Sequence, residues 1–330
     1  MAPLLSVGQT LRGRISTYSI VQELHRATDQ GAVYLGAYIC FYFFTPTVQE
    51  RANVLSIEQT IMDQNASSRA FGATDVLKTR PLAMSPLFRP LEDGILDPVD
   101  PPSIVLKYLD SDLRAESHHQ RLSRPDIKKV AKSVLEAPRI LHQDGLVHTD
   151  IKLDNIFVNL GQKNGNSERF TAIQLGDCDG AVSKESKFAS EPGHLIGASF
   201  TGSPEVQLGL PWGTITDIWS FGNAGYKPED ELYELVVLSR MHRYFGPFPK
   251  PFQEIADDNA AGIVDFIHSM GPPTKPFARV TRWEIPPADR DFILKIMKLD
   301  YRNRPTTEQL LEDEWFGESS EDTREPLSSV

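Results

Sequence analysis

The spacing of apolar and polar residues predicts a front part of the chain that is rich in β-strands. Residues 15–21 and 32–39 are rich in apolar, β-branched and aromatic residues, and a polar stretch at residues 26–31 lies between them, which predicts two strands joined by a turn. The run Ile104-Val-Leu-Lys-Tyr-Leu109 predicts another strand. Taken alone, this run is as typical of an ordinary core strand as of a strand whose end contacts a bound ligand.

The remainder of the chain has helical periodicity. From Asp126 to Gln143, apolar residues recur with one face inward, at Ile127, Val130, Val134, Leu135 and Leu141. Pro138 interrupts this pattern and predicts a kink or break, at a cost of roughly 3 kcal/mol if nothing absorbs it. Residues 289–298 and 306–314 predict two more helices, and Thr306 is a candidate cap for the second.

One hairpin is expected inside this helical part. Residues 156–158 and 172–175 are strand-like, and the segment between them, Asn159 to Arg169, is rich in turn residues. Residues 317–330 are polar and acidic without periodicity, which predicts a disordered tail.

Composition limits the class of protein. A chain of 330 residues with 40% hydrophobic content can form one two-lobed domain or two small ones. Cys40 and Cys178 are the only cysteines, so the sequence offers neither a disulfide framework nor a zinc spacing. This favours a reducing compartment, the cytoplasm, with the nucleus as the alternative. The 34 Lys and Arg against 45 Asp and Glu give a net charge of −11, which argues against a nucleic-acid partner.

No membrane association is expected. The most apolar run, residues 32–44, is too short to span a bilayer and is rich in aromatic and β-branched residues, so it is better interpreted as strand material. The first six residues lack the basic start and long apolar core of a secretory signal.

Candidate chemistry lies in the stretch His148-Thr-Asp-Ile-Lys-Leu-Asp-Asn155 and in Leu175-Gly-Asp-Cys-Asp-Gly180. Asp150 can accept the proton of an acceptor hydroxyl, and Lys152 can neutralise charge on a transferred phosphate. Asn155 and Asp177 offer oxygen ligands for Mg²⁺. If Asp150 and Asn155 were missing, Asp177 and Asp179 would be better interpreted as turn residues.

Three further short motifs follow the candidate catalytic residues along the chain. They are Ser203-Pro-Glu205, Asp217-Ile-Trp-Ser-Phe-Gly222 and Asp300-Tyr-Arg-Asn-Arg-Pro305. With the catalytic stretch, they make residues 104–316 resemble the eukaryotic protein kinases, of the serine/threonine type because of Lys152. A small-molecule kinase of related fold is the blander alternative, and the Ser-Pro-Glu and Asp-Ile-Trp-Ser-Phe-Gly motifs argue against it.

The resemblance implies an α+β, two-lobed fold. The expected parts are a β-rich N-lobe at residues 10–109, a mainly helical C-lobe at residues 110–316, and the tail. It also implies ATP and Mg²⁺ as cofactors, with Asp150 and Lys152 catalytic and Asn155 and Asp177 as metal ligands at the two ends of one hairpin. Arg304 is expected to pair with Glu205. Backbone groups of Lys107 and Leu109 would contact the adenine, with Leu106 behind it and Gly31 and Val33 covering the nucleotide.

The front of the chain departs from the family pattern. Aligning Val33 with the valine of the glycine-rich loop leaves Gly31 as its only glycine, with Arg26 and Thr28 at the other two positions. The family's strand lysine has no counterpart, because the chain has no lysine before Lys78 and neither Arg51 nor Arg69 lies in a strand pattern.

Ala73 occupies the position of the helix glutamate that orients this lysine. From Tyr38 to Met62 the pattern is lost, which indicates either divergence into a pseudokinase or, for residues 38–60, a misread exon.

The back half departs at single residues. Thr149 replaces the arginine that precedes the catalytic Asp, so activation by phosphorylation is not favoured. Ala198 replaces a threonine, Asp179 replaces the glycine of the metal motif, and Cys178 stands at its phenylalanine, where it is better interpreted as a small buried hydrophobe than as a redox sensor.

Two hypotheses about function therefore stand. The first is phosphoryl transfer from ATP to Ser or Thr hydroxyls of a protein substrate, weakened by the missing lysine. The second is a catalytically dead pseudokinase that acts as a binding or scaffold module and contacts a docking partner.

Overall fold

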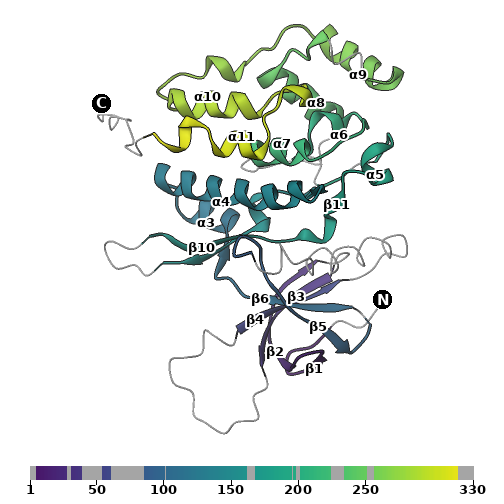
Figure 1. Cartoon of the computed structure of the whole chain (residues 1–330), viewed down its shortest axis with the longest axis vertical. Coiled ribbons are helices and arrows are strands. Elements are labelled where there is room, and N and C mark those ends of the chain that lie inside the picture. Colours follow the sequence, from purple (N-terminus) through teal and green to yellow (C-terminus); the bar gives the residue numbers. More distant parts are fainter. Residues whose placement is uncertain are drawn as a thin grey trace. The chain divides into compact units, whose positions relative to one another are not determined.

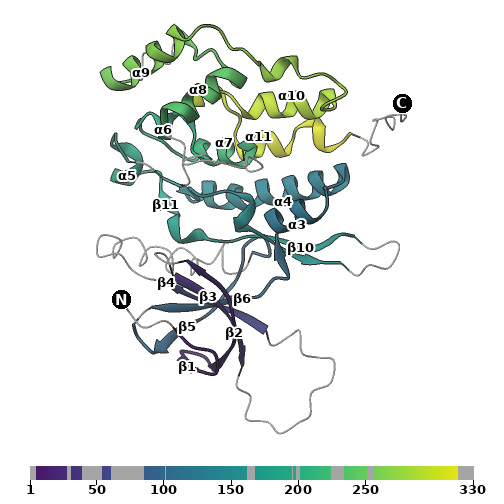
Figure 2. The ribbon, with the colours of Figure 1, turned by 180° about the vertical axis from the view of Figure 1, so that it is seen from behind.

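The chain divides into two compact units, Met1–Asp110 and Ser111–Val330. In this computed structural model the described residues are 5–27, 31–38, 54–60, 85–100, 102–161, 168–194, 196–197, 201–223, 234–250 and 256–318. Each unit has its own hydrophobic core. Figure 1 and Figure 2 show the strands of the first unit and the helices of the second.

The first unit is an antiparallel sheet. Its strands are β1 (Thr10–Gly13), β2 (Thr17–Ala27), β3 (Gly31–Tyr38), β4 (Val54–Thr60), β5 (Leu91–Asp97) and β6 (Ser103–Lys107). They lie in the order β1-β2-β3-β4-β6-β5, and β1 also pairs with β5, so the sheet closes on itself. Alternating residues fill its interior, because successive side chains of a strand point to opposite faces. This core contains Leu11, Tyr18, Ile20, Ala32, Tyr34, Leu55, Ile57 and Val105.

The predicted hairpin at the front is confirmed, but its two strands extend further into the polar stretch than the sequence indicated. Strands β2 and β3 pair from Tyr18↔Tyr38 to Ala27↔Gly31, so Arg26 lies in a strand opposite Ala32 and not in a turn. The backbone pairing of an antiparallel ladder therefore overrides the polar composition of this stretch. The predicted strand at residues 104–109 is also present, but it ends at Lys107.

Strand β4 lies within residues 38–62, where the family pattern was lost. It pairs with β3 from Gly31↔Thr60 to Ala37↔Val54, and with β6 on its other side. Leu55, Ser56 and Ile57 are buried. This part of the segment is therefore an interior strand of the sheet, whereas residues 39–53 lie outside the described residues.

The second unit begins with short strands and two helices, and its back half is helical. The elements up to the second hairpin are β7 (Ser111–Asp112), α3 (Leu113–His119), α4 (Arg124–Gln143), β8 (Leu146–Val147), η2 (Leu153–Asn155), β9 (Ile156–Leu160) and β10 (Phe170–Leu175). Then follow η3 (Cys178–Gly180), β11 (Val182–Ser183), α5 (Lys187–Ser190), α6 (Pro204–Gln207) and α7 (Ile215–Asn223). The last elements are α8 (Glu234–Phe245), α9 (Asp258–Ser269), η5 (Phe277–Arg279), α10 (Pro287–Ile296), η6 (Tyr301–Asn303), α11 (Thr307–Leu311) and η7 (Glu314–Phe316).

Helix α4 runs through the middle of the second unit, with α7 and α11 on one side and the β9–β10 hairpin on the other (Figure 1, Figure 2). It begins at Arg124, two residues before the predicted start, because Ser123 and Asp126 form a capping box and Pro125 occupies the first turn. Of the kink or break predicted at Pro138, the break is wrong, since the helix continues to Gln143. Pro138 is buried, and packing of the apolar face offsets the missing backbone hydrogen bond.

The predicted hairpin and the two late helices are also present. Strands β9 and β10 pair from Ile156↔Leu175 to Leu160↔Phe170. Helix α10 begins at Pro287, two residues before the predicted start. Helix α11 follows the cap at Thr306, which forms a capping box with Gln309, and it ends at Leu311 rather than residue 314.

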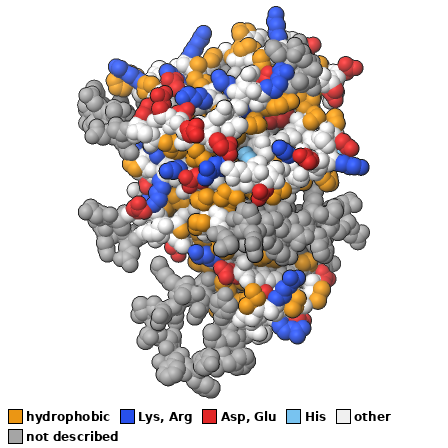
Figure 3. All heavy atoms as spheres, viewed as in Figure 1, with side chains coloured by type: hydrophobic (Ala, Val, Ile, Leu, Met, Phe, Trp, Pro, Cys, Tyr) orange, Lys and Arg blue, Asp and Glu red, His pale blue; other side chains and the backbone are white. Residues whose placement is uncertain are grey.

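The core of the second unit gathers around α7. Trp219 and Ile218 on this helix pack with residues of α4, α8, α9 and α10, including Leu135, Leu238, Val264 and Phe292. In the described part of the chain, no helix is both long and apolar enough to cross a bilayer. On the face seen in Figure 3, acidic and basic side chains are interspersed without a continuous field of either sign.

Candidate catalytic site

The loop that carries the candidate catalytic residues is anchored by one buried carboxylate, Asp217, in the first turn of α7. Its Oδ2 accepts hydrogen bonds from His148 N at 2.8 Å and from His142 Nε2 at 2.9 Å, and its Oδ1 accepts from Thr149 N at 2.9 Å. Bonds to a charged acceptor are about twice as strong as neutral ones. The carboxylate therefore fixes the backbone immediately before Asp150.

His148 joins this loop to the start of the metal motif. Asp150 N donates to His148 Nδ1 at 3.3 Å, which assigns the ring proton to Nε2. That nitrogen then donates to Gly176 O at 3.1 Å. The ring is fully buried, so each of its nitrogens needs such a partner.

Three of the predicted site residues come together. Lys152 Nζ lies 2.6 Å from Asp150 Oδ2, and Asn155 Nδ2 donates to the same oxygen at 3.0 Å and to Asp150 O at 2.8 Å. Asp150 Oδ1 is buried and has no hydrogen-bond partner among the described residues. A buried carboxylate oxygen without a partner is costly, which is a common feature of functional sites.

The charge of Lys152 is stabilised by this arrangement. Burial lowers the pKa of Lys152, but the hydrogen bond and charge of Asp150, together with the charges of Asp177 and Asp154, outweigh burial and raise it above its ordinary value. The ammonium group therefore persists throughout the physiological pH range.

The two predicted metal ligands lie at the same end of the β9–β10 hairpin. Asn155 directly precedes β9, Asp177 follows β10 by one residue, and Gly176 N donates to Asn155 O at 2.9 Å. Asp177 adopts a left-handed backbone with φ 57° and ψ 53°, which is uncommon for a residue other than glycine. Such strain is often stored at functional sites.

The donor set fits Mg²⁺ but does not form a closed cage. One carboxylate and one carboxamide oxygen are hard ligands, and Mg²⁺ in phosphate-transfer sites commonly uses one or two carboxylates plus substrate phosphates and water. Among the described residues, no group of three or more His, Cys, Asp or Glu side chains is placed to hold a metal ion.

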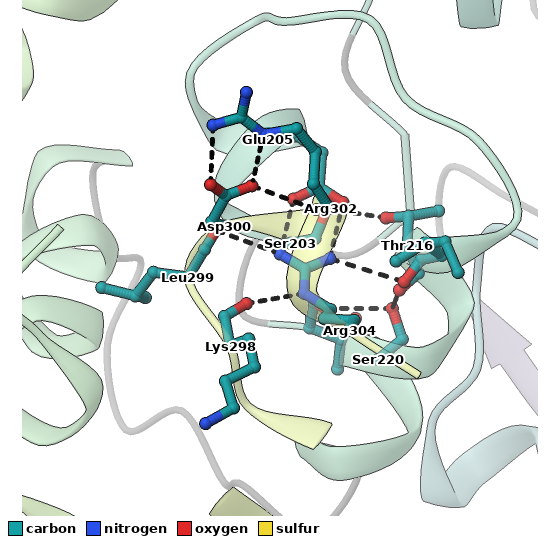
Figure 4. Close-up of polar contacts among 11 residues, drawn as sticks. Ser203, Glu205, Thr216, Ser220, Lys298, Leu299, Asp300, Arg302 and Arg304 are labelled. Carbon is teal, nitrogen blue, oxygen red and sulfur yellow. Dashed lines mark hydrogen bonds and ion pairs between the residues drawn. The ribbon is translucent and has the colours of Figure 1, made fainter. Parts of the chain in front are cut away.

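A buried ion pair joins residue 205 to residue 304, as the sequence predicted. Arg304 Nη1 and Nη2 each lie 2.7 Å from one oxygen of Glu205, and the two side chains are 0% and 2% exposed. Figure 4 shows this bidentate pair beside the second pair, Asp300 with Arg302. Arg304 also donates to Lys298 O at 2.7 Å, so its guanidinium is held on several sides.

The candidate nucleotide residues belong to the first unit. Gly31 and Val33 lie in β3, and Leu106 and Lys107 are the last two residues of β6. Leu109 lies two residues beyond the end of β6, and both Leu106 and Leu109 are buried. The backbone of Lys107 is already engaged, because its N–H donates to Pro90 O at 3.1 Å and its carbonyl accepts from Arg89 Nε at 2.9 Å. Of its two backbone groups, the carbonyl retains a lone pair for a ligand.

Sequence reasoning missed the strand that follows the front hairpin. Its residues Leu55-Ser-Ile-Glu58 align with the family's Val-Ala-Ile-Lys strand motif at two apolar positions, Leu55 and Ile57. Glu58 then occupies the lysine position, and its backbone pairs directly with Val33. The four-residue pattern was the available signal. The anchoring by Asp217 and His142 was missed because it depends on contacts between residues about 70 positions apart.

Comparison with known proteins identifies the family to which this chain is similar. Residues 99–316, two thirds of the chain, match the family described as Protein kinase domain. Similar proteins include serine/threonine-protein kinase US3 of Human herpesvirus 1, which is 36% identical over 102 residues, 31% of this chain and 19% of that protein. Serine/threonine-protein kinase PAK 4 of Homo sapiens is 28% identical over 159 residues, 48% of this chain and 24% of that protein.

A third relative matches more of the chain. MAP kinase kinase MKK1/SSP32 of Saccharomyces cerevisiae is 29% identical over 199 residues, 59% of this chain and 33% of that protein. The chain thus spans a third or less of the length of these relatives. Because the family match covers most of the chain and includes the catalytic loop, the metal motif and the Glu205–Arg304 pair, this protein belongs to the protein kinase family.

Proposed function

We propose that this protein transfers the γ-phosphoryl group of ATP to Ser or Thr hydroxyls of a protein substrate, with reduced efficiency. The observation that carries the proposal is the buried Asp150 Oδ1, which has no partner while Oδ2 is occupied by Lys152 and Asn155. One carboxylate oxygen is thereby positioned for an incoming hydroxyl.

Each of these residues would have its own role in the reaction. Asp150 Oδ1 orients the acceptor hydroxyl and receives its proton as the new oxygen–phosphorus bond forms and the bond to the ADP oxygen breaks. Lys152, whose raised pKa keeps it charged, balances negative charge on the transferred group. Asn155 holds Asp150 in place through two hydrogen bonds.

Asn155 Oδ1 and the Asp177 carboxylate are the atoms that would hold Mg²⁺. The ion would neutralise phosphate charge and orient the nucleotide. Asp177 lies within the electrostatic reach of Lys152, so the cation and the metal ligand belong to one charged cluster.

The reduced efficiency follows from β4. This strand reads Val-Leu-Ser-Ile-Glu-Gln-Thr, so Glu58 is its one charged residue and it carries no cation for the α- and β-phosphates. Loss of one electrostatic donor typically slows turnover roughly 10²–10³-fold. The same observation supports the second candidate function, a pseudokinase that binds a partner protein without transfer.

Two substitutions separate these functions. Transfer from ATP to the chain itself and to a generic basic protein is measured for the wild type, Asp150→Asn and Glu58→Lys. We expect Asp150→Asn to reduce the rate about 10²–10⁴-fold, because the amide keeps the shape but cannot accept the proton. Glu58→Lys should raise the rate by roughly 10²-fold, because it supplies the missing donor.

The exposed Asp144→Asn substitution, at the end of α4, is the matched control and should leave the rate unchanged. Asp177→Asn should instead weaken the thermal shift caused by Mg²⁺ and ATP, since a neutral amide is a poorer ligand for a hard cation. A rate that is equal in wild type and Asp150→Asn contradicts the transferase proposal. No transfer in either the wild type or Glu58→Lys supports the pseudokinase.

A further inference from the structure

Thr149, which directly precedes the candidate catalytic Asp150, has a strained backbone. Its φ is 75°, a left-handed conformation that is an outlier for a β-branched residue. The residue is buried, and its N–H donates to Asp217 at 2.9 Å. Because the surrounding contacts must over-determine such a conformation, the side chain of Thr149 is expected to make a specific interaction.

The Thr149 side chain makes a hydrogen bond to Gly180, at the start of the segment that follows the metal motif Asp177-Cys-Asp179. Thr149 Oγ1 donates to Gly180 O at 3.0 Å. A Cβ at Gly180 would lie 2.8 Å from this hydroxyl oxygen, so a side chain at position 180 would displace the Thr149 hydroxyl.

Later in the same segment, Gly197 also approaches Thr149. A Cβ at Gly197 would lie 2.4 Å from Thr149 O, and Gly197 has φ 64°. Thr149 therefore lies close to both Gly180 and Gly197, which are 17 positions apart in the chain (197 − 180).

Two other connections hold the start of the segment, on either side of Gly180. Before it, His148 donates to Gly176 O, and after it Val182 and Ser183 of β11 pair with Val147 and Leu146 of β8. Gly180, which accepts the Thr149 hydrogen bond, lies between Gly176 and Val182 along the chain. The Thr149 hydroxyl is thus placed to hold the backbone around Asp177 and Cys178.

We propose that Thr149 is a positioning residue whose hydroxyl latches residues 176–183 to the catalytic loop, so that the metal-ligand loop is held without a phosphate. A kinase activation loop ordered by phosphorylation relies on new pairs between arginine and phosphate. Here an uncharged hydroxyl bonds to a backbone carbonyl, and this bond is present in the unmodified chain. The inference deepens the proposed function, because it concerns regulation of the same site, but its main readout needs no catalysis.

The test is hydrogen–deuterium exchange of the peptide covering residues 177–184. Thr149→Val keeps the β-branched shape and the backbone strain and removes only the hydroxyl donor. We expect exchange in this peptide to become roughly 2- to 10-fold faster, the effect of losing one neutral hydrogen bond on local opening. Thr149→Ser keeps the donor and should restore the wild-type rate to within about twofold.

Two further variants complete the design. Gly180→Ala should also speed exchange, because the added Cβ would displace the Thr149 hydroxyl from Gly180 O. Thr171→Val is the matched control, since the Thr171 hydroxyl also donates to a backbone carbonyl, that of Asn159, but on the exposed side of β10. It should leave the peptide unchanged, as should phosphatase treatment of the wild type.

Binding of Mg²⁺ with ATP gives a second readout. If the latch positions Asp177, Thr149→Val should raise the half-saturating nucleotide concentration by about 2- to 10-fold, while the melting temperature without nucleotide stays that of Thr149→Ser. Exchange that is equal in wild type and Thr149→Val, or faster after phosphatase, overturns the proposal. Faster exchange in Thr149→Val together with absent phosphoryl transfer in the wild type supports the latch and refutes the proposed enzyme.

Discussion

At the scale of single residues, the carboxylate of Asp217 matters as much as the residues that would carry out the chemistry. It is fully buried and accepts three hydrogen bonds, from His148 N, Thr149 N and His142 Nε2. The strained backbone of Thr149 persists because this acceptor holds it. The position of Asp150 therefore depends on Asp217, which lies 67 positions later in the chain (217 − 150).

Asp217→Asn tests this dependence. The amide has one oxygen in place of two, so in either orientation its NH₂ group faces a backbone N–H. We expect the free energy of unfolding to fall by about 2–3 kcal/mol, the typical cost of leaving a buried donor without its charged acceptor. Urea denaturation measures the change.

Asp154→Asn is the control for this measurement, because Asp154 lies in the same loop but pairs with Arg114 at the surface. It should change stability by less than about 1 kcal/mol. Equal stability of Asp217→Asn and the wild type would mean that another group anchors the loop.

At the scale of secondary-structure elements, one carboxylate joins the turn between β1 and β2 to β5. Asp93 accepts hydrogen bonds from the backbone N–H groups of Arg14, Ile15, Ser16 and Gly94 and from the hydroxyl of Tyr18. These bonds explain how a short strand such as β1 closes the sheet. Burial alone would raise the pKa of Asp93, but the donors from Ile15, Tyr18, Gly94 and Ser16 outweigh it and lower the pKa below its ordinary value of 3.8.

The lowered pKa gives the contribution of Asp93 a defined pH dependence. The stabilisation is fully present above pH 3.8, the ordinary value, and is lost as the pH falls through the lower pKa of the folded state. We expect Asp93→Asn to lower the free energy of unfolding of the first unit by about 2–4 kcal/mol at pH 7. The difference from wild type should shrink below pH 3.8, which denaturant titrations across pH measure.

Glu92→Gln serves as the control, because Glu92 is the neighbour of Asp93 on β5. It should alter stability by less than about 1 kcal/mol at each pH. A difference between Asp93→Asn and wild type that persists unchanged under acidic conditions would contradict the role assigned to the charge.

At the scale of the second unit as a whole, the Glu205–Arg304 pair connects α6 with the chain after α10. The guanidinium of Arg304 also lies 5.1 Å from the centre of the Trp219 ring, at the core around α7. Ser203 and Thr216 share a hydrogen bond of 2.7 Å beside it (Figure 4). The pair thereby fixes the end of the segment that follows the candidate metal motif.

Arg304→Ala should lower the free energy of unfolding by about 3–5 kcal/mol, because it leaves the Glu205 carboxylate buried and unpaired. The double variant Glu205→Leu with Arg304→Met should be less destabilised than Arg304→Ala, since it leaves no unpaired charge. Arg290→Ala, which removes a surface pair with Asp291, should cost less than about 1 kcal/mol. An unchanged melting temperature of Arg304→Ala would refute the structural importance of the pair.

Much of the candidate site could be predicted from the sequence because its parts are close along the chain. Asp150, Lys152 and Asn155 lie within six residues, and Asp177 follows at the other end of a hairpin whose turn composition is evident. The helix cap at Thr306 is likewise local. The start of α4 was missed although its signal, Ser123 with Asp126 three residues later, is present in the sequence.

The sequence by itself indicated the family, the candidate residues of the catalytic loop and, through the family resemblance, the pairing of Glu205 with Arg304, because these motifs follow one another in the family's order. Only the tertiary structure decided that Val54–Thr60 is an interior strand, that α4 continues through Pro138, and that Asp217 and Asp93 anchor distant backbone segments. The physical reason is that packing and hydrogen bonds between residues far apart in the chain outweigh local propensity.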